Sequence, residues 1–185
     1  MTRSILFIAA LAAASLPATA ALAQGTTPQQ GVQADPKPAA LVKQDRDFIE
    51  EAAQGGLFEV RAGQLAQQKA MADEVKQFGK RMVDDHTAVN GRLQQLAQQK
   101  GLNVPQQLDK KHQDRIDSLA KKTGGDFDKA YVDAMVDDHK GDVDAFDRMS
   151  KDAKDADLKA FAASTLPTLR DHLTSIQSIK DHLKT

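Results

Sequence analysis

The chain has 185 residues, a formal net charge of -1 at pH 7 and no cysteine. The absence of cysteine excludes disulfide bonds, thiolate metal ligands and a lipid-modified cysteine. A nearly balanced charge without a basic patch argues against nucleic acid as a partner.

Residues 1–23 have the pattern of a secretory signal peptide. Arg3 precedes an apolar run that extends from Ile5 to about Leu16, and small residues follow just before Gln24. The apolar run is too short to span a bilayer permanently, and a membrane anchor is the alternative interpretation. We expect a periplasmic protein without integral membrane insertion, with peripheral association with the outer membrane as a further option.

The remaining chain divides into a tether and one domain. Residues 24–43 are rich in Gln, Pro, Gly and Thr, a composition that buries too little apolar surface to become ordered. Residues 44–184 have the length of a single domain and contain no run of alternating β-branched residues. We therefore expect a flexible tether followed by an all-α domain.

Helix-breaking residues and apolar periodicity predict helices at 45–71, 73–100, 105–122, 126–152 and 155–183. Each long helix has one apolar stripe, whereas the helix at 105–122 is short and strongly polar. Helices with a single stripe bury it by facing one another. The fold class expected is a four-helix bundle with an extra short connecting helix between the second and third long helices.

The pentapeptide MVDDH occurs twice, at 82–86 and at 135–139. If the connecting helix carries the chain back along the bundle, the helix at 126–152 runs parallel to the helix at 73–100. The two copies would then lie side by side. An old duplication is one explanation of the repeat, and chance similarity of helical sequence is the other.

One ionisable residue falls inside the apolar stripe of each long helix. These residues are Glu59, His86, His139 and His172. Each lies near the middle of its predicted helix, so all four are expected at one height in the bundle. A buried charge without a partner costs several kcal/mol. The four side chains are therefore expected to form one polar layer that satisfies itself or binds a cation.

Three imidazoles and a carboxylate form a ligand set that suits one ion of zinc, copper or iron, and bundle cores are used for such sites. The alternative is a metal-free hydrogen-bond network that contains a trapped water. A catalytic His–Glu pair is the third option, but no nucleophile accompanies the layer. The sequence thus favours a binding protein over an enzyme.

Four further residues flank the layer. Met82 and Met135 each lie one helical turn before a histidine, where a thioether would favour Cu(I) or simply fill the core. Asp85 and Asp138 directly precede histidines, where a carboxylate either orients an imidazole or remains solvated.

Several segments resemble the bacterial family called domain of unknown function 4142, which is grouped with the ferritin-like superfamily. They are DFIEEAAQGGLFEVRAGQLAQQKA, VKQFGKRMVDDHTAVNGRLQQLAQQKGLNVP, GDFDKAYVDAMVDDHKGDV and LKAFAASTLPTLRDHL. The resemblance covers about residues 44–180 and implies a helical bundle. Members are commonly labelled exported or outer membrane proteins, and the resemblance implies no established activity.

The ferritin-like resemblance also implies a metal site, but the di-iron pattern is missing. That pattern requires Glu-x-x-His on two helices, and here Val83, Val136 and Leu169 stand three residues before the histidines. We therefore expect a mononuclear site or none.

Two functions remain open at this point. One is an exported bundle that binds one transition-metal ion in envelope metal handling or stress. The other is a non-enzymatic structural or interaction protein of the cell envelope. No envelope partner and no oligomeric state can be read from the sequence.

Overall fold

A computed structural model describes residues 40–183, which form five α-helices. The helices are α1 (Lys43–Lys69), α2 (Asp73–Gln99), α3 (Lys110–Ala120), α4 (Gly124–Asp152) and α5 (Ala156–His182). The expected all-α bundle with a short connecting helix is confirmed. The predicted signal peptide and most of the predicted tether lie outside the described residues. Within residues 40–183 no helix is long and apolar enough to cross a membrane.

The predicted helix bounds lie within two residues of the observed ones, except at the start of the connecting helix. The connecting helix begins at Lys110 rather than at residue 105, because the Asp109 side chain accepts the backbone N–H of His112 and caps the helix there. The loop before it is held to α1, where the Gln54 side chain accepts the N–H of Asp109 at 2.9 Å. The predicted tether also ends too late, since Leu41 is already buried in the core.

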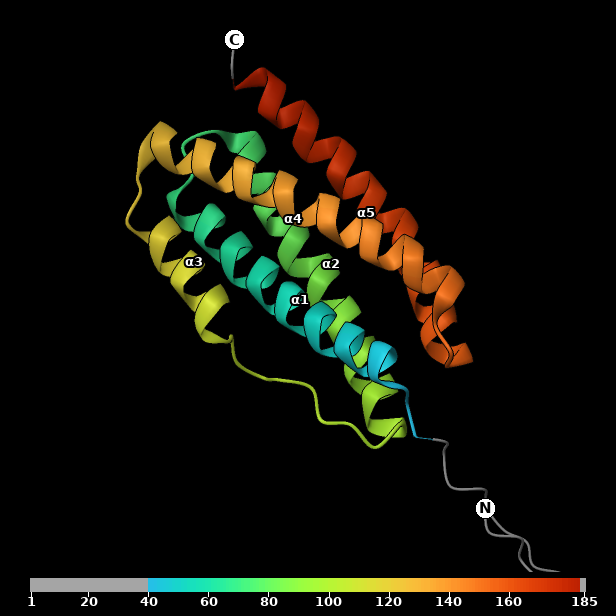
Figure 1. The fold of residues 1–185 in the computed structure, drawn as a ribbon. Helices are drawn as coiled ribbons and strands as arrows, with labels where there is room; N and C mark the ends of the chain where they lie inside the picture. Colours follow the sequence, from blue (N-terminus) through green and yellow to red (C-terminus); the bar gives the residue numbers. More distant parts are fainter. Residues whose placement is uncertain (1–39, 184–185) are drawn as a thin grey trace, which may run out of the picture. The chain divides into compact units, whose positions relative to one another are not determined.

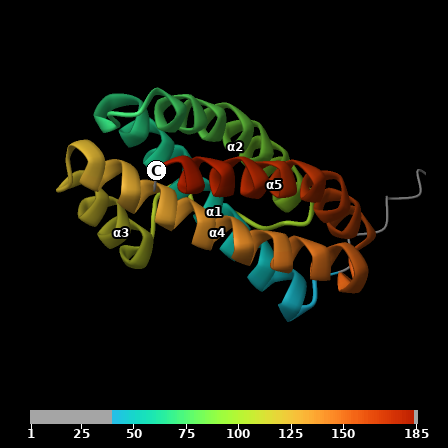
Figure 2. The same ribbon diagram turned by 90° about the horizontal axis from the view of Figure 1, so that it is seen from above.

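The bundle consists of two antiparallel hairpins, α1–α2 and α4–α5 (Figure 1). Helix α1 packs against α2 and α4, and α5 packs against α4 and α2. In the view from above, α2 and α4 lie on opposite sides of α5 (Figure 2). Helix α4 runs parallel to α2, as predicted, but the two MVDDH copies face each other diagonally across the core instead of lying side by side.

The apolar core is divided into two clusters. One cluster contains Phe48, Leu93 and Leu158, and the other contains Phe58, Val75 and Ile176. Each cluster takes residues from both hairpins. His86, His139 and His172, which belong to neither cluster, are buried between these two sets of positions along their helices, and Glu59 is buried beside Phe58 at the edge of the second cluster. The polar layer predicted from the helical stripes therefore separates the two halves of the core.

The two hairpins repeat one another. Helix α2 begins at Asp73 and α5 begins at Ala156, which is 83 residues later. The same spacing of 83 residues separates Asp45 of α1 from Asp128 of α4. Asp45 and Asp128 are buried, and each accepts backbone N–H groups at the start of a helix in the other hairpin. Asp45 accepts from Lys154 and Asp155 at the start of α5, and Asp128 accepts from Met71 and Ala72 at the start of α2. Each hairpin thus caps a helix of the other.

The two helices of the first hairpin approach closely at glycines. A Cβ atom on Gly63 would lie 2.5 Å from the carbonyl oxygen of Gly79, and one on Gly79 would lie 2.7 Å from the Cβ of Ala66. Only glycine fits at such a crossing. The close approach occurs about one turn from Glu59 and holds α1 against α2 beside the polar layer.

A pair of glycine substitutions tests this crossing. Gly63→Ala forces α1 and α2 apart and should reduce the free energy of unfolding by about 1–3 kcal/mol. In Gly91→Ala, the added Cβ meets no atom within 4 Å, so the better helix propensity should stabilise by about 0.5–1 kcal/mol. Urea unfolding followed by circular dichroism measures both. Equal effects of the two substitutions would contradict a close approach at Gly63.

Candidate metal site

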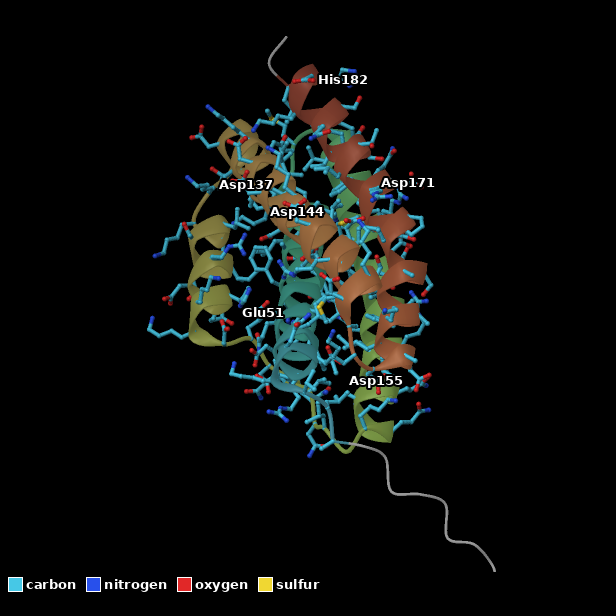
Figure 3. All side chains as sticks on the ribbon, turned by 45° about the vertical axis from the view of Figure 1, so that its right-hand side comes forward. Glu51, Asp137, Asp144, Asp155, Asp171 and His182 are labelled. Atoms are coloured by element: carbon cyan, nitrogen blue, oxygen red, sulfur yellow. The ribbon has the colours of Figure 1, made fainter. Side chains whose placement is uncertain are left out.

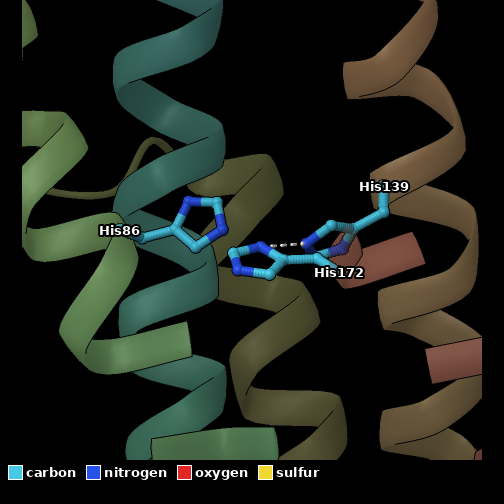
Figure 4. A group of neighbouring side chains, drawn as sticks. All are labelled: His86, His139 and His172. Carbon is cyan, nitrogen blue, oxygen red and sulfur yellow. Dashed lines mark hydrogen bonds between the residues drawn. The ribbon is translucent and has the colours of Figure 1, made fainter. Parts of the chain in front are cut away.

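The layer contains one side chain from each long helix. Glu59 of α1, His86 of α2, His139 of α4 and His172 of α5 are each no more than 3% exposed. Figure 4 shows the three imidazoles gathered in the centre of the bundle. One nitrogen from each ring lies within 4.8 Å of one nitrogen from each of the others. The sequence therefore located correctly the residues that meet.

Each imidazole uses one nitrogen for a bond directed away from the others. His86 Nδ1 lies 2.7 Å from Glu59 Oε2, His139 Nδ1 lies 2.9 Å from the Met135 carbonyl oxygen, and His172 Nε2 lies 2.8 Å from Asp85 Oδ2. Carbonyl and carboxylate oxygens accept hydrogen bonds, so these three nitrogens carry the protons. The second nitrogen of each neutral ring is then a lone pair. These nitrogens are His86 Nε2, His139 Nε2 and His172 Nδ1.

No hydrogen-bond donor among the described residues points at these inward lone pairs. His139 Nε2 and His172 Nδ1 lie 3.3 Å apart, although in these tautomers both are acceptors. Among the described residues, no donor reaches His86 Nε2 or Glu59 Oε1, and Glu59 Oε1 lies 3.4 Å from His139 Nε2. Acceptors that face one another in a buried space need a cation or a proton between them. The hydrogen bonds to the outer oxygens also fix the orientation of each ring, as such bonds do for histidine ligands in metal sites.

Burial keeps the histidines neutral. It lowers the pKa of His86 to about 4 and that of His172 to about 3, and it also lowers the pKa of His139. Neutral imidazole is the form that binds a metal ion. For Glu59, burial raises the pKa to about 7, although the neighbouring His139 opposes this shift.

Asp142 of α4, which was not predicted from the sequence, lies against Glu59. Burial raises the pKa of the Asp142 carboxyl well above its ordinary value, and the nearby Glu59 carboxylate raises it further. Two carboxyl groups that close together share a proton or a cation. A signal for Asp142 was present, because it lies three residues after His139 and four before Phe146, on the inward side of the same stripe.

The four residues predicted to flank the layer differ in what they contact. Asp85 binds an imidazole, but it is His172 of α5 and not the adjacent His86. Asp138 forms an ion pair at 2.8 Å with Arg115 of α3, so it contacts the connecting helix instead of an imidazole. Met82 and Met135 are fully buried in the core cluster that contains Phe58. By contrast, Asp137, Asp144 and Asp171 are exposed on the surface (Figure 3).

The fold and the layer define a four-helix bundle with a short connecting helix and a buried histidine centre. Residues 27–179 match the family described as "Domain of unknown function (DUF4142)", and the chain belongs to this family. The expected family is thereby confirmed. No curated protein matches the chain.

Solved structures with a similar fold have low sequence identity to this chain. A DUF305 fragment from Deinococcus radiodurans has a TM-score of 0.68 and 11% identity, and the match covers 78% of this chain and 99% of that one. CopM in its Cu(I)-bound form has a TM-score of 0.63 and 16% identity, and the match covers 75% of this chain and 96% of that one. Identities this low establish the fold alone.

The histidine pKa values predict how stability depends on pH in metal-free protein. With their ordinary pKa near 6.5, these histidines take up protons in the unfolded chain first, so their contribution is complete above pH 6.5 and is lost as the pH falls toward 4. Glu59 acts in the opposite sense, since its contribution is complete below its ordinary pKa of 4.5 and is lost as the pH rises from there to about 7. Because three histidines outweigh one carboxyl group, we expect the free energy of unfolding to rise with pH from about 4 to 6.5 and to change little above pH 7.

Urea unfolding between pH 4 and 8 with a chelator present measures this profile. In Glu59→Gln the rise between pH 4.5 and 6.5 should be steeper, because the opposing contribution of the carboxyl group is removed, and in His172→Gln this rise should be smaller. A profile that is unchanged in both variants would contradict the assignment of these groups.

Proposed function

We propose that the protein binds one transition-metal ion at His86, His139 and His172, with Glu59 beside them. The observation that supports this most directly is the orientation of the rings. Each imidazole donates one N–H to an outer oxygen, which leaves one lone pair per ring for a shared ligand. A metal ion accepts these lone pairs at once, whereas a network without a cation leaves acceptors facing acceptors.

Imidazole nitrogens suit zinc, copper and iron. Copper is the ion to test first, for two reasons. CopM, which shares the fold, has been solved in Cu(I)-bound and Cu(II)-bound forms. In addition, Met82 and Met135 are buried one turn before His86 and His139, where their thioethers would support the reduced state. Glu59 would balance part of the charge of the ion.

The role we infer is metal handling or stress protection in the cell envelope. The signal-peptide pattern at residues 1–23 supports export to the periplasm. No nucleophile lies in the layer that would support covalent catalysis, so storage, buffering or delivery of an ion fits better than an enzymatic reaction. Because the buried groups come from all four long helices, binding of the ion would also raise the free energy of unfolding.

A second candidate is a structural or interaction protein of the envelope whose layer stays free of metal. The contact of 2.7 Å between His86 Nδ1 and Glu59 Oε2 supports it, because this bond alone would fix α1 against α2. In this case the layer sets the helix register, and a proton or water occupies the centre.

Calorimetric titration with Cu²⁺ and Zn²⁺, together with metal analysis of the purified protein, separates the two candidates. We expect one ion per chain, and thermal stability that falls when a chelator is added. His139→Gln should abolish tight binding. Asp85→Asn, which removes the outer partner of His172, should weaken binding by about 10- to 100-fold.

His182→Ala serves as the matched control, because the His182 side chain is 68% exposed and distant from the layer. It should leave the affinity unchanged. Circular dichroism confirms that each variant is folded. Absence of tight binding in the wild-type protein, or binding that His139→Gln does not change, would refute the metal proposal and favour the metal-free layer.

A further inference from the structure

A small cavity of about 10 Å³ lies next to the polar layer. Its polar lining consists of Glu59, His86, Asn90 and Asp142, and the rest is apolar. This volume is about that of one water molecule or one small ion. His139 and His172 do not line it. The cavity is therefore a separate position from the space that the three imidazoles share.

The cavity lining presents acceptors without donors. Glu59 Oε1 and Asn90 Oδ1 are buried and receive no hydrogen bond from the described residues. Glu59 as a whole is 1% exposed. The Asn90 amide is held in place by α1, since a Cβ on Gly56 would lie 2.0 Å from its oxygen. Two fixed oxygen acceptors thus face a space that is large enough for a single atom.

The charge of the lining also lacks compensation. Glu59 and Asp142 bring two neighbouring carboxyl groups into it, and no lysine or arginine lines the cavity. Arg115 of α3, a basic group that contacts α4, is engaged by Asp138. Two carboxylates in a buried space are stable only with a proton or a cation between them.

We propose that this cavity is a second cation site, in which Glu59, Asp142 and Asn90 hold a divalent ion through oxygen atoms. Carboxylate and amide oxygens are the ligands of hard ions such as Mn²⁺ and Mg²⁺, unlike the imidazole site beside it. Glu59 Oε2 lies at His86 Nδ1, and Glu59 Oε1 receives no hydrogen bond and lies 3.4 Å from His139 Nε2, so the carboxylate lies between the two positions. In sharing Glu59, the second site rests on the proposed function.

The cavity adjoins a groove at Asn90. Asn90 and Leu93 line the cavity and also a groove of about 330 Å³ between α1, α2 and residues 104–106. The Asn90 amide, which packs against Gly56, therefore separates the cavity from this groove.

Mn²⁺ is the probe, because free Mn²⁺ has a strong electron paramagnetic resonance signal that binding removes. The purified protein is stripped with chelator, loaded with one equivalent of Zn²⁺ for the imidazole site, and titrated with Mn²⁺. We expect one equivalent of bound Mn²⁺ with retention of the Zn²⁺. Asp142→Asn should weaken Mn²⁺ binding at least about 10-fold, as loss of a ligand does, and should leave the Zn²⁺ bound.

Asp144→Asn is the matched control, because Asp144 lies two residues further along α4 with an exposed side chain (Figure 3), and it should bind both ions normally. Asn90→Leu, which removes the amide ligand without changing charge, is the second variant and should also weaken Mn²⁺ binding.

Unchanged Mn²⁺ binding in Asp142→Asn, no bound Mn²⁺ in the wild type, or Mn²⁺ that binds only by displacing Zn²⁺ would overturn the second site. Mn²⁺ binding that depends on Asp142, in a protein that fails to bind Zn²⁺ or Cu²⁺, would overturn the proposed function and leave the second site standing.

Discussion

The structure depends on how a carboxylate is accommodated at the centre of an apolar bundle. Glu59 is almost completely buried, and its partners are imidazoles from α2 and α4 instead of lysine or arginine. A buried carboxylate cannot remain uncompensated. This need brings one histidine from each of the other long helices to the same height and divides the core into two clusters. The same arrangement leaves lone pairs pointing inward, and from these the proposed metal chemistry follows.

The repeat of the two hairpins places acidic groups in equivalent positions. The spacing that relates Asp45 to Asp128 also relates Glu59 to Asp142. The first pair caps helices at the two ends of the bundle, and the second pair meets near its middle. Packing one hairpin against another of the same design brings corresponding residues of α1 and α4 together. The carboxyl pair beside the cavity is thus a consequence of the architecture, and the histidines, which do not follow this spacing, distinguish the two halves.

Much of the fold and part of the site could be predicted from local patterns. Apolar periodicity identified all four long helices within a few residues, and the same periodicity showed that Glu59, His86, His139 and His172 point inward. The connecting helix was predicted too long, because its start is set by the Asp109 cap and by contacts of the preceding loop with Gln54 of α1. The sequence left open whether Asp85 orients an imidazole or stays solvated. Its partner His172 lies on another helix, and the spacing within one helix carries no information about that neighbour.

The sequence by itself determined the helical class and the set of inward histidines, because both follow from side-chain periodicity along single helices, and the resemblance of its segments indicated the family. Only the tertiary structure decided which helices are neighbours. It placed α2 and α4 diagonally, so that the histidines of the two MVDDH copies meet across the core and not along an edge. It also brought Asp142 to Glu59 and Asp85 to His172, because contacts between helices depend on the packing of whole faces. The direction of each imidazole nitrogen, on which metal binding depends, is fixed by those contacts.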